Sequence, residues 1–334
     1  ILVLESGGSL EKYFLSSNIK LHMPVKNYNW LINKFYNLLR IFIIMKNNKN
    51  SIFHFFLPEA YLLGGLCGYI LKHRFMIMSR RSLNNYQKKI YLTKYFEMKL
   101  HKIMSYIISN SNAVGNDLKS EGVKNEKLIR IYNGIKSKNK TTFPLSNKNK
   151  IFKTKEIINL VVVSNLIKYK GHEDLIKAMS IIKNQIKYKW KLFFVGRDDG
   201  IKHSLEYLAR DLNISKNLKF LGLIEDTNSI WSNADISIIP SHEEGFSNSL
   251  IEGMSFGLPC IVTNVGGNTE AINNGINGLV VKSKSPKDLS VAILKLINDQ
   301  KLRTKLGKKA KDDVVKKFNF EKTKTDYINL YKKF

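Results

Sequence analysis

The stretch "SHEEGFSNSLIEG", Ser241–Gly253, carries three carboxylates, of which Glu244 and Glu252 stand eight positions apart. It follows the apolar run "ISIIP" and leads into a segment whose apolar residues recur at helical spacing. This pattern predicts a buried strand, then a loop that holds the first acid. A helix that begins near Asn248, with Ser247 as its N-cap, is expected to hold the second acid.

Strand-like and helix-like segments alternate on both sides of this stretch, which predicts parallel sheets built from right-handed crossovers. A polar segment poor in apolar periodicity interrupts the alternation and predicts a linker. The sequence therefore predicts an α/β fold with two Rossmann-like, doubly wound domains facing across a cleft. The expected parts are a first domain at 1–135, a linker at 136–155, a second domain at 156–318 and a final helix at 319–334 that crosses back to the first domain. In the first domain, strands are expected at 1–4, 19–25, 52–56, 75–78 and 106–109, and helices at 10–16, 30–45, 58–71, 88–104 and 112–121.

Ligands of such sheets bind beyond the carboxyl ends of the strands, which is where the loop of Glu244 is expected. A helix start preceded by glycine can hold a phosphate on its free N–H groups. Glu252, on the helix, can accept hydrogen bonds from two vicinal hydroxyls, and Glu244 can reach toward a sugar. Taken alone, two acids at this spacing are more typical of a solvent-exposed helix start, and the surrounding segments are what favour binding. The residues expected to face a phosphate are Gly245, Phe246, Ser247 and Asn248.

The next segment is "GMSFGLPCIVTNVGGNTEAI", residues 253–272. Together with the acid pair it resembles the large family of retaining glycosyltransferases with the GT-B fold, family 4 in the usual classification. The resemblance covers nearly the whole chain and is strongest from Val161 to Val281. It implies that Glu244 and Glu252 bind a nucleoside-diphosphate sugar, with Glu252 on the ribose and Glu244 among the catalytic residues.

A second element of the resemblance is "VVVSNLIKYKG", residues 161–171. Lys170 matches the family lysine that contacts the donor diphosphate, although a solvated lysine is the alternative in a lysine-rich chain. Asn165 stands where an arginine is common. Its amide can donate one neutral hydrogen bond, whereas an arginine would make a charged, bidentate contact with the diphosphate. Arg197, in "FFVGRDDG", is a candidate replacement for that charge.

Glycines complete the expected donor site. Gly196 ends a strand where a side chain would crowd the cleft. Gly266 and Gly267 match a family loop at a strand's carboxyl end, with plain turn glycines as the alternative.

In the first domain, Arg80 occupies roughly the position where many relatives have a cleft histidine, and it is expected to face a phosphate or an acidic acceptor. His54 is open to a structural or a cleft role. The family's Gly-rich loop after its first strand is not found, and Gly7-Gly8 does not match it. Residues 1–25 resemble the second strand of the family fold and the segment after it, so we expect the first strand, that loop and its helix to be absent.

The resemblance implies glycosyl transfer with retention, in which the leaving diphosphate takes the proton of a hydroxyl acceptor. No carboxylate suggests itself as the nucleophile of a double displacement. No Asp-x-Asp motif occurs, so we expect no cofactor and no essential metal. The alternatives are a nucleotide-sugar epimerase of the same fold and a non-catalytic nucleotide-sugar-binding protein. The expected acceptors belong to cell-surface polysaccharide or lipid-linked glycan synthesis.

The chain has a formal net charge of +28 from 55 Lys+Arg and 27 Asp+Glu. Compositional drift toward lysine and asparagine explains this excess, and attraction to an anionic membrane surface is the functional alternative. Nucleic acid is not expected, because no basic stripe is interleaved with stacking aromatic residues. The two cysteines, Cys67 and Cys260, lie far apart in apolar runs and fit a reducing compartment. We therefore expect a cytoplasmic protein, peripheral at the inner face of the membrane.

Overall fold

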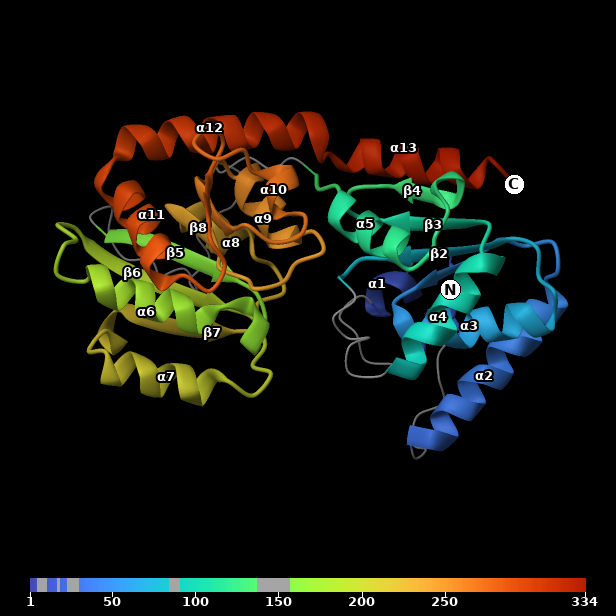
Figure 1. Ribbon diagram of the computed structural model, residues 1–334. Helices are drawn as coiled ribbons and strands as arrows, with labels where there is room; N and C mark the ends of the chain where they lie inside the picture. Colours follow the sequence, from blue (N-terminus) through green and yellow to red (C-terminus); the bar gives the residue numbers. More distant parts are fainter. Residues whose placement is uncertain (5–10, 17–18, 23–29, 84–90, 137–156) are drawn as a thin grey trace. The chain divides into compact units, whose positions relative to one another are not determined.

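The computed structural model of the chain describes residues 1–4, 11–16, 19–22, 30–83, 91–136 and 157–334. It divides into unit 1, Ile1–Ile131 with Ile328–Phe334, and unit 2, Tyr132–Tyr327. Each unit is built on a parallel sheet with helices packed against it (Figure 1). The predicted α/β class is therefore confirmed, and each unit is described by itself below.

Unit 1 has a four-stranded parallel sheet in which the strands follow one another in chain order. A sequential order of parallel strands requires one crossover helix after each strand. The strands are β1 (Phe53–Phe56), β2 (Met76–Arg80), β3 (Tyr106–Ser109) and β4 (Leu128–Arg130). The helices are α1 (Glu11–Leu15), α2 (Trp30–Asn47), α3 (Pro58–Ile70), α4 (Tyr91–Ile103) and α5 (Asn112–Ser120).

Helices α2 to α5 supply one hydrophobic core against this sheet. Ile41 and Met45 of α2 pack in the same cluster as Met76 and Met78 of β2. Side chains of α3, α4 and α5 join that cluster or pack against it. The apolar segment at 52–71 is thus β1 followed by the packed helix α3, as predicted, and none of the helices within the described ranges has the length and apolar character that a bilayer crossing requires.

The start of the chain differs from the prediction. The expected strands at 1–4 and 19–25 are represented by a single parallel bridge between Leu2 and His22, with residues 23–25 outside the described ranges. Two backbone hydrogen bonds hold it, from Val3 N to His22 O at 3.0 Å and from His22 N to Ile1 O at 2.8 Å. The bridge joins no strand of either sheet among the described residues, and a two-stranded pair is marginal on its own.

The last residues of the chain belong to unit 1. Helix α13 (Phe320–Tyr331) ends there, where the Tyr331 hydroxyl lies 2.7 Å from His54 Nδ1 on β1. The ring of Phe334 packs edge-on against Phe75 and Tyr106. The C-terminal turn therefore covers part of the unit 1 sheet.

Unit 2 has a six-stranded parallel sheet in the order β10-β9-β8-β5-β6-β7. The chain starts in the middle at β5, proceeds outward through β6 and β7, and then returns to β8 on the other side. The neighbours β5 and β8 therefore form a topological switch point, where ligands of open α/β sheets bind. The strands are β5 (Ile157–Val163), β6 (Lys189–Val195), β7 (Leu218–Gly222), β8 (Ile236–Ile239), β9 (Cys260–Thr263) and β10 (Leu279–Val281).

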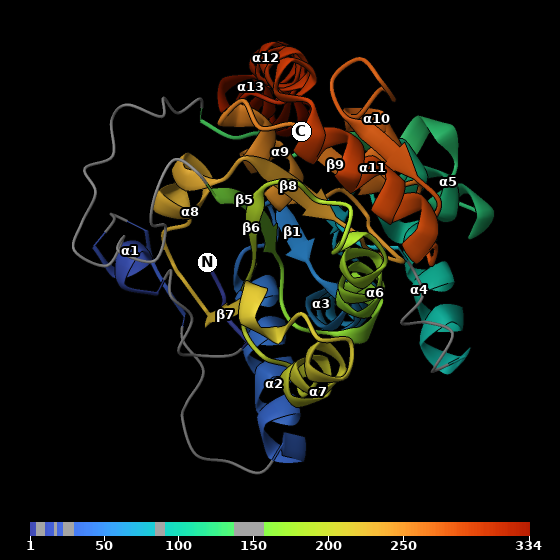
Figure 2. The ribbon, with the colours of Figure 1, turned by 90° about the vertical axis from the view of Figure 1, so that its left-hand side faces the viewer.

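Helices cover both faces of this sheet, because alternate residues of each buried strand point to opposite sides. Leu160 and Val162 of β5 pack in the cluster that contains residues of α6, α7 and α11, whereas Val161 packs with Trp231 of α8. Figure 2 shows α8 on the opposite side of this sheet from α6 and α7. Helices α9 and α12 share a further cluster with β8 and β9. The helices are α6 (His172–Ile182), α7 (Lys202–Asp211), α8 (Asn228–Asn233), α9 (Asn248–Ser255), α10 (Asn268–Ala271), α11 (Pro286–Asn298) and α12 (Gln300–Lys317).

Candidate functional site

An ion pair joins the two loops that follow β5 and β8 at the switch point. Lys170 Nζ lies 2.7 Å from Glu244 Oε1, although 74 residues separate them in the sequence. The hydroxyl of Ser241 donates to the same carboxylate oxygen at 2.8 Å. The Glu244 side chain is 9% exposed and that of Lys170 is 18% exposed. The structure thus brings together two residues that the sequence singled out separately, and both retain contact with solvent.

Gly171 makes this ion pair sterically feasible. Its φ of 72° lies in the left-handed region, and a Cβ at this position would lie 2.0 Å from the carbonyl oxygen of Pro240. Only glycine allows the loop to lie this close to the end of β8. The Tyr169 carbonyl accepts a hydrogen bond from His242 N at 2.7 Å, and the Lys170 ammonium lies 5.3 Å from the Tyr169 ring centroid. The lysine is therefore held in place by its own loop.

Gly196 has a similar function between β5 and β6. With φ of 153°, a Cβ there would lie 2.1 Å from Ser164 O. The amide of Asn165, in the next position, accepts a hydrogen bond from the backbone N of Arg197 at 3.3 Å. The Arg197 guanidinium is exposed and pairs with Asp199 at 2.7 Å. The charge proposed to replace the missing family arginine is therefore already matched by a neighbouring carboxylate.

The start of α9 is fixed by a side-chain cap. Ser247 Oγ accepts from Leu250 N at 3.3 Å, so the predicted N-cap is confirmed. Gly245 O accepts from Gly267 N at 3.1 Å, which brings the loop before α9 against the Gly266-Gly267 loop after β9. The N–H groups at the beginning of α9 and these two glycine loops thus lie at the same edge of the sheet.

Phe246 and Asn248, on either side of the cap residue Ser247, are each held by contacts of their own. Phe246 is buried, with its ring centroid 5.3 Å from that of Tyr132 and 5.2 Å from that of Phe318. The side chain of Asn248 accepts a hydrogen bond from Asn133 Nδ2 at 2.7 Å. Phe246 therefore anchors the loop through packing, and only its backbone N–H is suited to a ligand.

Glu252 has its own partners, separate from those of Glu244. Its Oε2 accepts from the indole Nε1–H of Trp231 at 3.0 Å and lies 3.4 Å from the hydroxyl of Thr227. The carboxylate borders a cavity of about 370 Å³. The other residues that line this cavity are Ile135, Lys136, Glu225, Asp226, Thr227, Asn228, Trp231, Ser255, Phe256 and Phe320.

Ser241, Trp231 and Thr227 were not among the site residues predicted from the sequence. Ser241 lies within the stretch that decided the fold, so its hydroxyl could have been considered there. Trp231 and Thr227 lie more than 20 positions before Glu252, on an element with no chemical motif. Only the packing of α8 beside α9 reveals that they support the acid.

His172, at the start of α6, is also part of this region and was not predicted. It is 1% exposed, and its Nε2–H donates to the carbonyl of Asn165 at 3.0 Å. Burial lowers the pKa of His172 to about 4, partly offset by that hydrogen bond. The ring is therefore neutral at physiological pH and fixes the backbone of the loop that leads to Lys170.

Arg80, expected in a phosphate-facing role, has a different environment in unit 1. Its guanidinium is 4% exposed and lies 2.6 Å from a carboxylate oxygen of Glu97 and 2.6 Å from one of Glu121. His101 Nε2 lies 2.9 Å from the second oxygen of Glu121, and Tyr61 OH lies 2.7 Å from His101 Nδ1. The expectation that Arg80 faces a ligand is corrected: its charge is taken up inside the protein, by Glu97 on α4 and by Glu121 just after α5.

Glu97, His101 and Glu121 have ligand atoms close enough together to hold a metal ion. The guanidinium of Arg80 already bridges the two carboxylates, which supplies the positive charge that such a group requires. We therefore interpret these residues as a buried charge cluster. His54 likewise has structural partners, Tyr331 and Ser79, and burial followed by the charge of Arg81 lowers its pKa to about 3.

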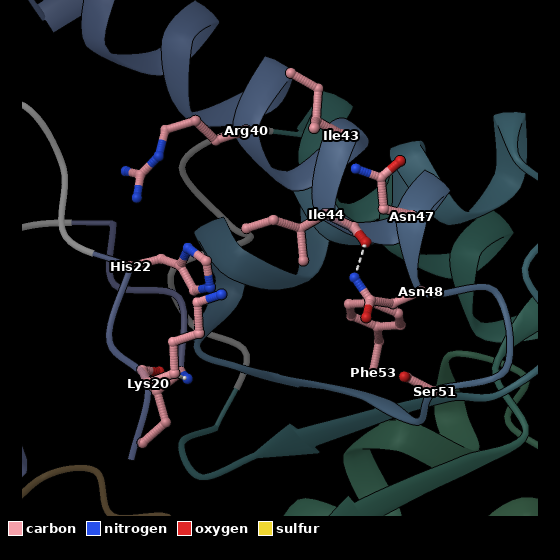
Figure 3. Close-up of a pocket in the computed structure, with 10 residues that line it drawn as sticks. Lys20, His22, Arg40, Ile43, Ile44, Asn47, Asn48, Ser51 and Phe53 are labelled. Carbon is pink, nitrogen blue, oxygen red and sulfur yellow. Dashed lines mark hydrogen bonds between the residues drawn. The ribbon is translucent and has the colours of Figure 1, made fainter. Parts of the chain in front are cut away.

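A second cavity, of about 620 Å³, lies in unit 1 (Figure 3). Arg40 on α2 lies opposite Lys20 and His22 across it. Burial lowers the pKa of His22, and the charges of Lys20, the N-terminus and Arg40 lower it further. The cavity is basic, and none of the residues expected to bind the donor lines it.

The sequence pattern of the family described as glycosyl transferases group 1 matches residues 144–313, about half of the chain. The chain belongs to this glycosyltransferase family. Its matched residues include the Lys170–Glu244 pair, Glu252 and both glycine loops.

Two curated relatives illustrate the family. The capsular polysaccharide biosynthesis glycosyltransferase CapM of Staphylococcus aureus is 27% identical over all of this chain and 89% of its own length. The N,N'-diacetylbacillosaminyl-diphospho-undecaprenol α-1,3-N-acetylgalactosaminyltransferase of Campylobacter jejuni is 30% identical over 64% of this chain and 53% of its own length. The similarity to the second relative is thus confined to part of each protein.

Solved structures show the same fold at low sequence identity. HepE of Anabaena, crystallised with UDP, matches with a TM-score of 0.83 at 17% identity over 98% of this chain and 90% of its own. Sucrose-phosphate synthase of Thermosynechococcus elongatus matches with a TM-score of 0.76 at 22% identity over 94% of this chain and 82% of its own. The predicted fold of the GT-B glycosyltransferases, with two Rossmann-like domains, is thereby confirmed.

Proposed function

We propose that this glycosyltransferase moves a hexose-type sugar from a nucleoside-diphosphate sugar to a hydroxyl of a polysaccharide or lipid-linked glycan, with retention at the anomeric carbon. The observation that carries the proposal is the Lys170–Glu244 pair at the switch point, beside the free N–H groups at the start of α9. A cation and a helix start at one sheet edge suit a diphosphate. The names of relatives that build capsule or act on an undecaprenol-linked sugar support the acceptor class.

Lys170 is assigned the role of contacting the diphosphate as it leaves. Its ammonium is paired with Glu244 in this structure, so a diphosphate must attract it more strongly than the carboxylate does. When Lys170 turns to the phosphates, the freed oxygen of Glu244 can accept a hydrogen bond from a sugar hydroxyl. The pair therefore couples phosphate binding to sugar positioning, and its charges stabilise the transition state more than the ground state.

Glu252 is assigned to the ribose. One of its oxygens is occupied by Trp231 and Thr227, which fixes the orientation of the carboxylate toward the 370 Å³ cavity. A carboxylate held in this way can accept hydrogen bonds from vicinal hydroxyls. The structures of HepE with UDP and with UDP-glucose support a uridine nucleotide as the first donor to test.

In the proposed reaction the acceptor oxygen attacks on the face from which the diphosphate leaves, and a phosphate oxygen takes the acceptor proton. The protein contributes orientation and charge stabilisation, through Lys170 and the start of α9. The proposal requires no essential metal, because these groups offset the charge that develops on the diphosphate.

The test compares thermal unfolding with UDP, GDP, ADP and CDP for the native chain, Glu252→Gln and Glu173→Gln. Glu173 is an exposed acid on α6 and serves as a control for loss of one negative charge. One nucleotide should raise the unfolding temperature of the native chain and of Glu173→Gln, because binding stabilises the folded state by about 2.7 kcal/mol at a hundredfold excess over Kd. The rise should be much smaller for Glu252→Gln. No rise with any nucleotide, or an equal rise in Glu252→Gln, contradicts the proposed donor site.

The catalytic part of the proposal is tested with the sugar nucleotide of the base so identified. Transfer requires that donor consumption depends on an acceptor and yields a product with the donor's anomeric configuration. Epimerisation of the donor without acceptor, or binding without consumption, would establish one of the two alternatives that share the fold.

A further inference from the structure

Helix α2 is apolar on two opposite sides. Ile41 and Met45 face the core of unit 1 and are at most 5% exposed. A second stripe at helical spacing is exposed instead, by 37% to 63% of each residue. A helix that is apolar all round is normally buried all round, so this second stripe is suited to a further partner. Its residues are Ile32, Phe35, Tyr36, Leu39 and Ile43.

The neighbouring helices extend the exposed apolar surface. Helix α3 packs beside α2 and α4 beside α3, in one layer against the sheet (Figure 1). Since all three helices turn their buried stripes toward the sheet, their exposed stripes share the outer face of the layer. We name this surface the outer face. Besides the stripe of α2, it contains Leu66, Tyr69 and Ile70 of α3 and Tyr95, Phe96 and Met98 of α4.

The charges on these helices are almost all positive. Helix α2 has no acidic residue, α3 has Glu59 and α4 has Glu97. Glu59 lies 3.7 Å from Lys34, and Glu97 is buried against Arg80. The ammonium of Lys99 lies 5.2 Å from the Tyr95 ring centroid, so one basic group lies directly beside an exposed aromatic ring. The basic residues of the three helices are Lys34, Arg40, Lys46, Lys94, Lys99 and Lys102.

The basic cavity of unit 1 adjoins the same helix. Figure 3 shows Arg40 and Ile43 on α2, with Lys20 and His22 opposite Arg40. Positive charge thus borders the exposed apolar stripe along one side. Exposed aromatic and aliphatic side chains with basic residues around them are typical of helices that lie in the interface of an anionic bilayer.

Unit 2 provides the contrast. Its helices α6, α7 and α11, all within the described part of the chain, each expose one large apolar residue: Ile181, Tyr207 and Val291, respectively. Single exposed residues are normal on a soluble surface. The clustering on α2 to α4 is therefore a property of unit 1 and does not follow from the composition of the whole chain.

We propose that the outer face of α2 to α4 docks on a lipid bilayer that contains anionic lipid. The apolar stripes enter the headgroup region, and the exposed lysines Lys46, Lys99 and Lys102 contact the lipid phosphates. Docking through unit 1 would keep the enzyme at the surface where a lipid-linked acceptor is found. The proposal needs neither donor nor turnover, so it stands or falls separately from the proposed function.

The experiment is sedimentation of the full chain with vesicles of phosphatidylcholine and phosphatidylglycerol at 7:3, and with phosphatidylcholine alone. The variant Ile32→Gln/Phe35→Gln/Leu39→Gln removes three exposed residues of the stripe. The matched control is Ile181→Gln/Tyr207→Gln/Val291→Gln, whose residues are exposed to a similar degree in unit 2. We expect the stripe variant to bind the mixed vesicles at least tenfold more weakly than the native chain, and the control to bind within twofold of it.

A charge series tests the electrostatic part. Lys46→Gln/Lys99→Gln/Lys102→Gln is compared with Lys216→Gln/Lys295→Gln/Lys308→Gln, which removes three exposed lysines from unit 2. Each lysine near an anionic surface contributes about fivefold to binding, so the first variant should lose more than tenfold and the second little. Binding by the native chain should also fall in 0.5 M salt and be weak on pure phosphatidylcholine.

Hydrogen exchange of the native chain makes the test independent of how the variants fold. On mixed vesicles, peptides from 30–47, 58–70 and 91–103 should gain protection, and peptides from 157–298 should not. Equal vesicle binding by the stripe variant and its unit 2 control, or protection that is confined to unit 2, overturns the proposal. So does a concentration-dependent dimer that buries the outer face without vesicle binding, because the partner would then be a second copy of the chain.

Discussion

The two units each contain a basic residue at the carboxyl edge of a parallel sheet, Arg80 at the end of β2 and Lys170 in the loop after β5, but the surroundings of these residues are opposite. In unit 1, the side chains of Arg80 and of its partners Glu97 and Glu121 are at most 4% exposed. In unit 2, Lys170 and Glu244 are 18% and 9% exposed and lie at a topological switch point. Charges removed from water remain with their partners, because separating them leaves a buried charge unpaired. Partly solvated charges can exchange partners, which is what a binding site needs.

Removal of the buried cation should have the largest effect. We expect Arg80→Met to lower the free energy of unfolding of unit 1 by about 3–5 kcal/mol, since Glu97 and Glu121 lose the guanidinium that bridges them. Urea denaturation of the full chain measures this. Arg74→Met, at an exposed arginine of the same unit, is the control and should change the value by less than about 0.5 kcal/mol. A loss below about 1 kcal/mol for Arg80→Met would show that the cluster is not structural.

The buried histidine of unit 2 should make stability depend on pH. Since burial holds the pKa of His172 near 4, the folded ring stays neutral, whereas the unfolded ring takes up a proton below its ordinary pKa of 6.5. The stabilisation is complete above pH 6.5 and is lost as the pH falls to 4, by about 3 kcal/mol. His172→Gln should lack this part of the pH dependence, and His203→Gln, at an exposed histidine, should retain it. Parallel curves for the native chain and His172→Gln would refute the assignment.

The two sheets and the Arg80 cluster show what the sequence could and could not predict. The α/β alternation, both sheets and the start of α9 follow from local periodicity and from a serine cap, so they were predicted. The partners of Arg80 lie 17 and 41 positions away, on α4 and just after α5, and no local pattern connects them. A basic residue after a strand therefore predicts a site only when its burial is known. The prediction of strands at 1–4 and 19–25 was wrong for a related reason. Whether an apolar segment pairs as a strand depends on the strands beside it, which the apolar pattern of the sequence does not specify.

Removal of the indole N–H of Trp231 should have a smaller effect, which we expect on the affinity for the nucleotide. Trp231→Phe keeps the ring in the core but removes the N–H that orients Glu252. The loss of one hydrogen bond to a carboxylate held in a preformed site costs about 1 kcal/mol, or roughly fivefold in the Kd of the nucleotide. Calorimetric titration measures the Kd. Trp190→Phe, at a second buried tryptophan, should leave it unchanged, and equal weakening in both variants would deny Trp231 this role.

An exposed ion pair should have the smallest effect. Lys177 and Glu173 pair across one turn of α6, with side chains 44% and 63% exposed. Lys177→Met should lower stability by about 0.3–0.5 kcal/mol, since solvent screens the pair. Thermal unfolding measures the change. A loss comparable to that of Arg80→Met would show that burial does not determine how much each ion pair in this chain contributes to the free energy of unfolding.

The proposed function depends on the partly solvated Lys170–Glu244 pair of unit 2. Its most direct test is the kcat for release of nucleoside diphosphate from the sugar nucleotide, in the presence of acceptor, for Lys170→Met and the control Lys177→Met. We expect a kcat at least about a hundredfold lower for Lys170→Met, because the leaving diphosphate loses its cation, with Lys177→Met close to the native value. A kcat for Lys170→Met within threefold of the native value would show that Lys170 does not stabilise the leaving group.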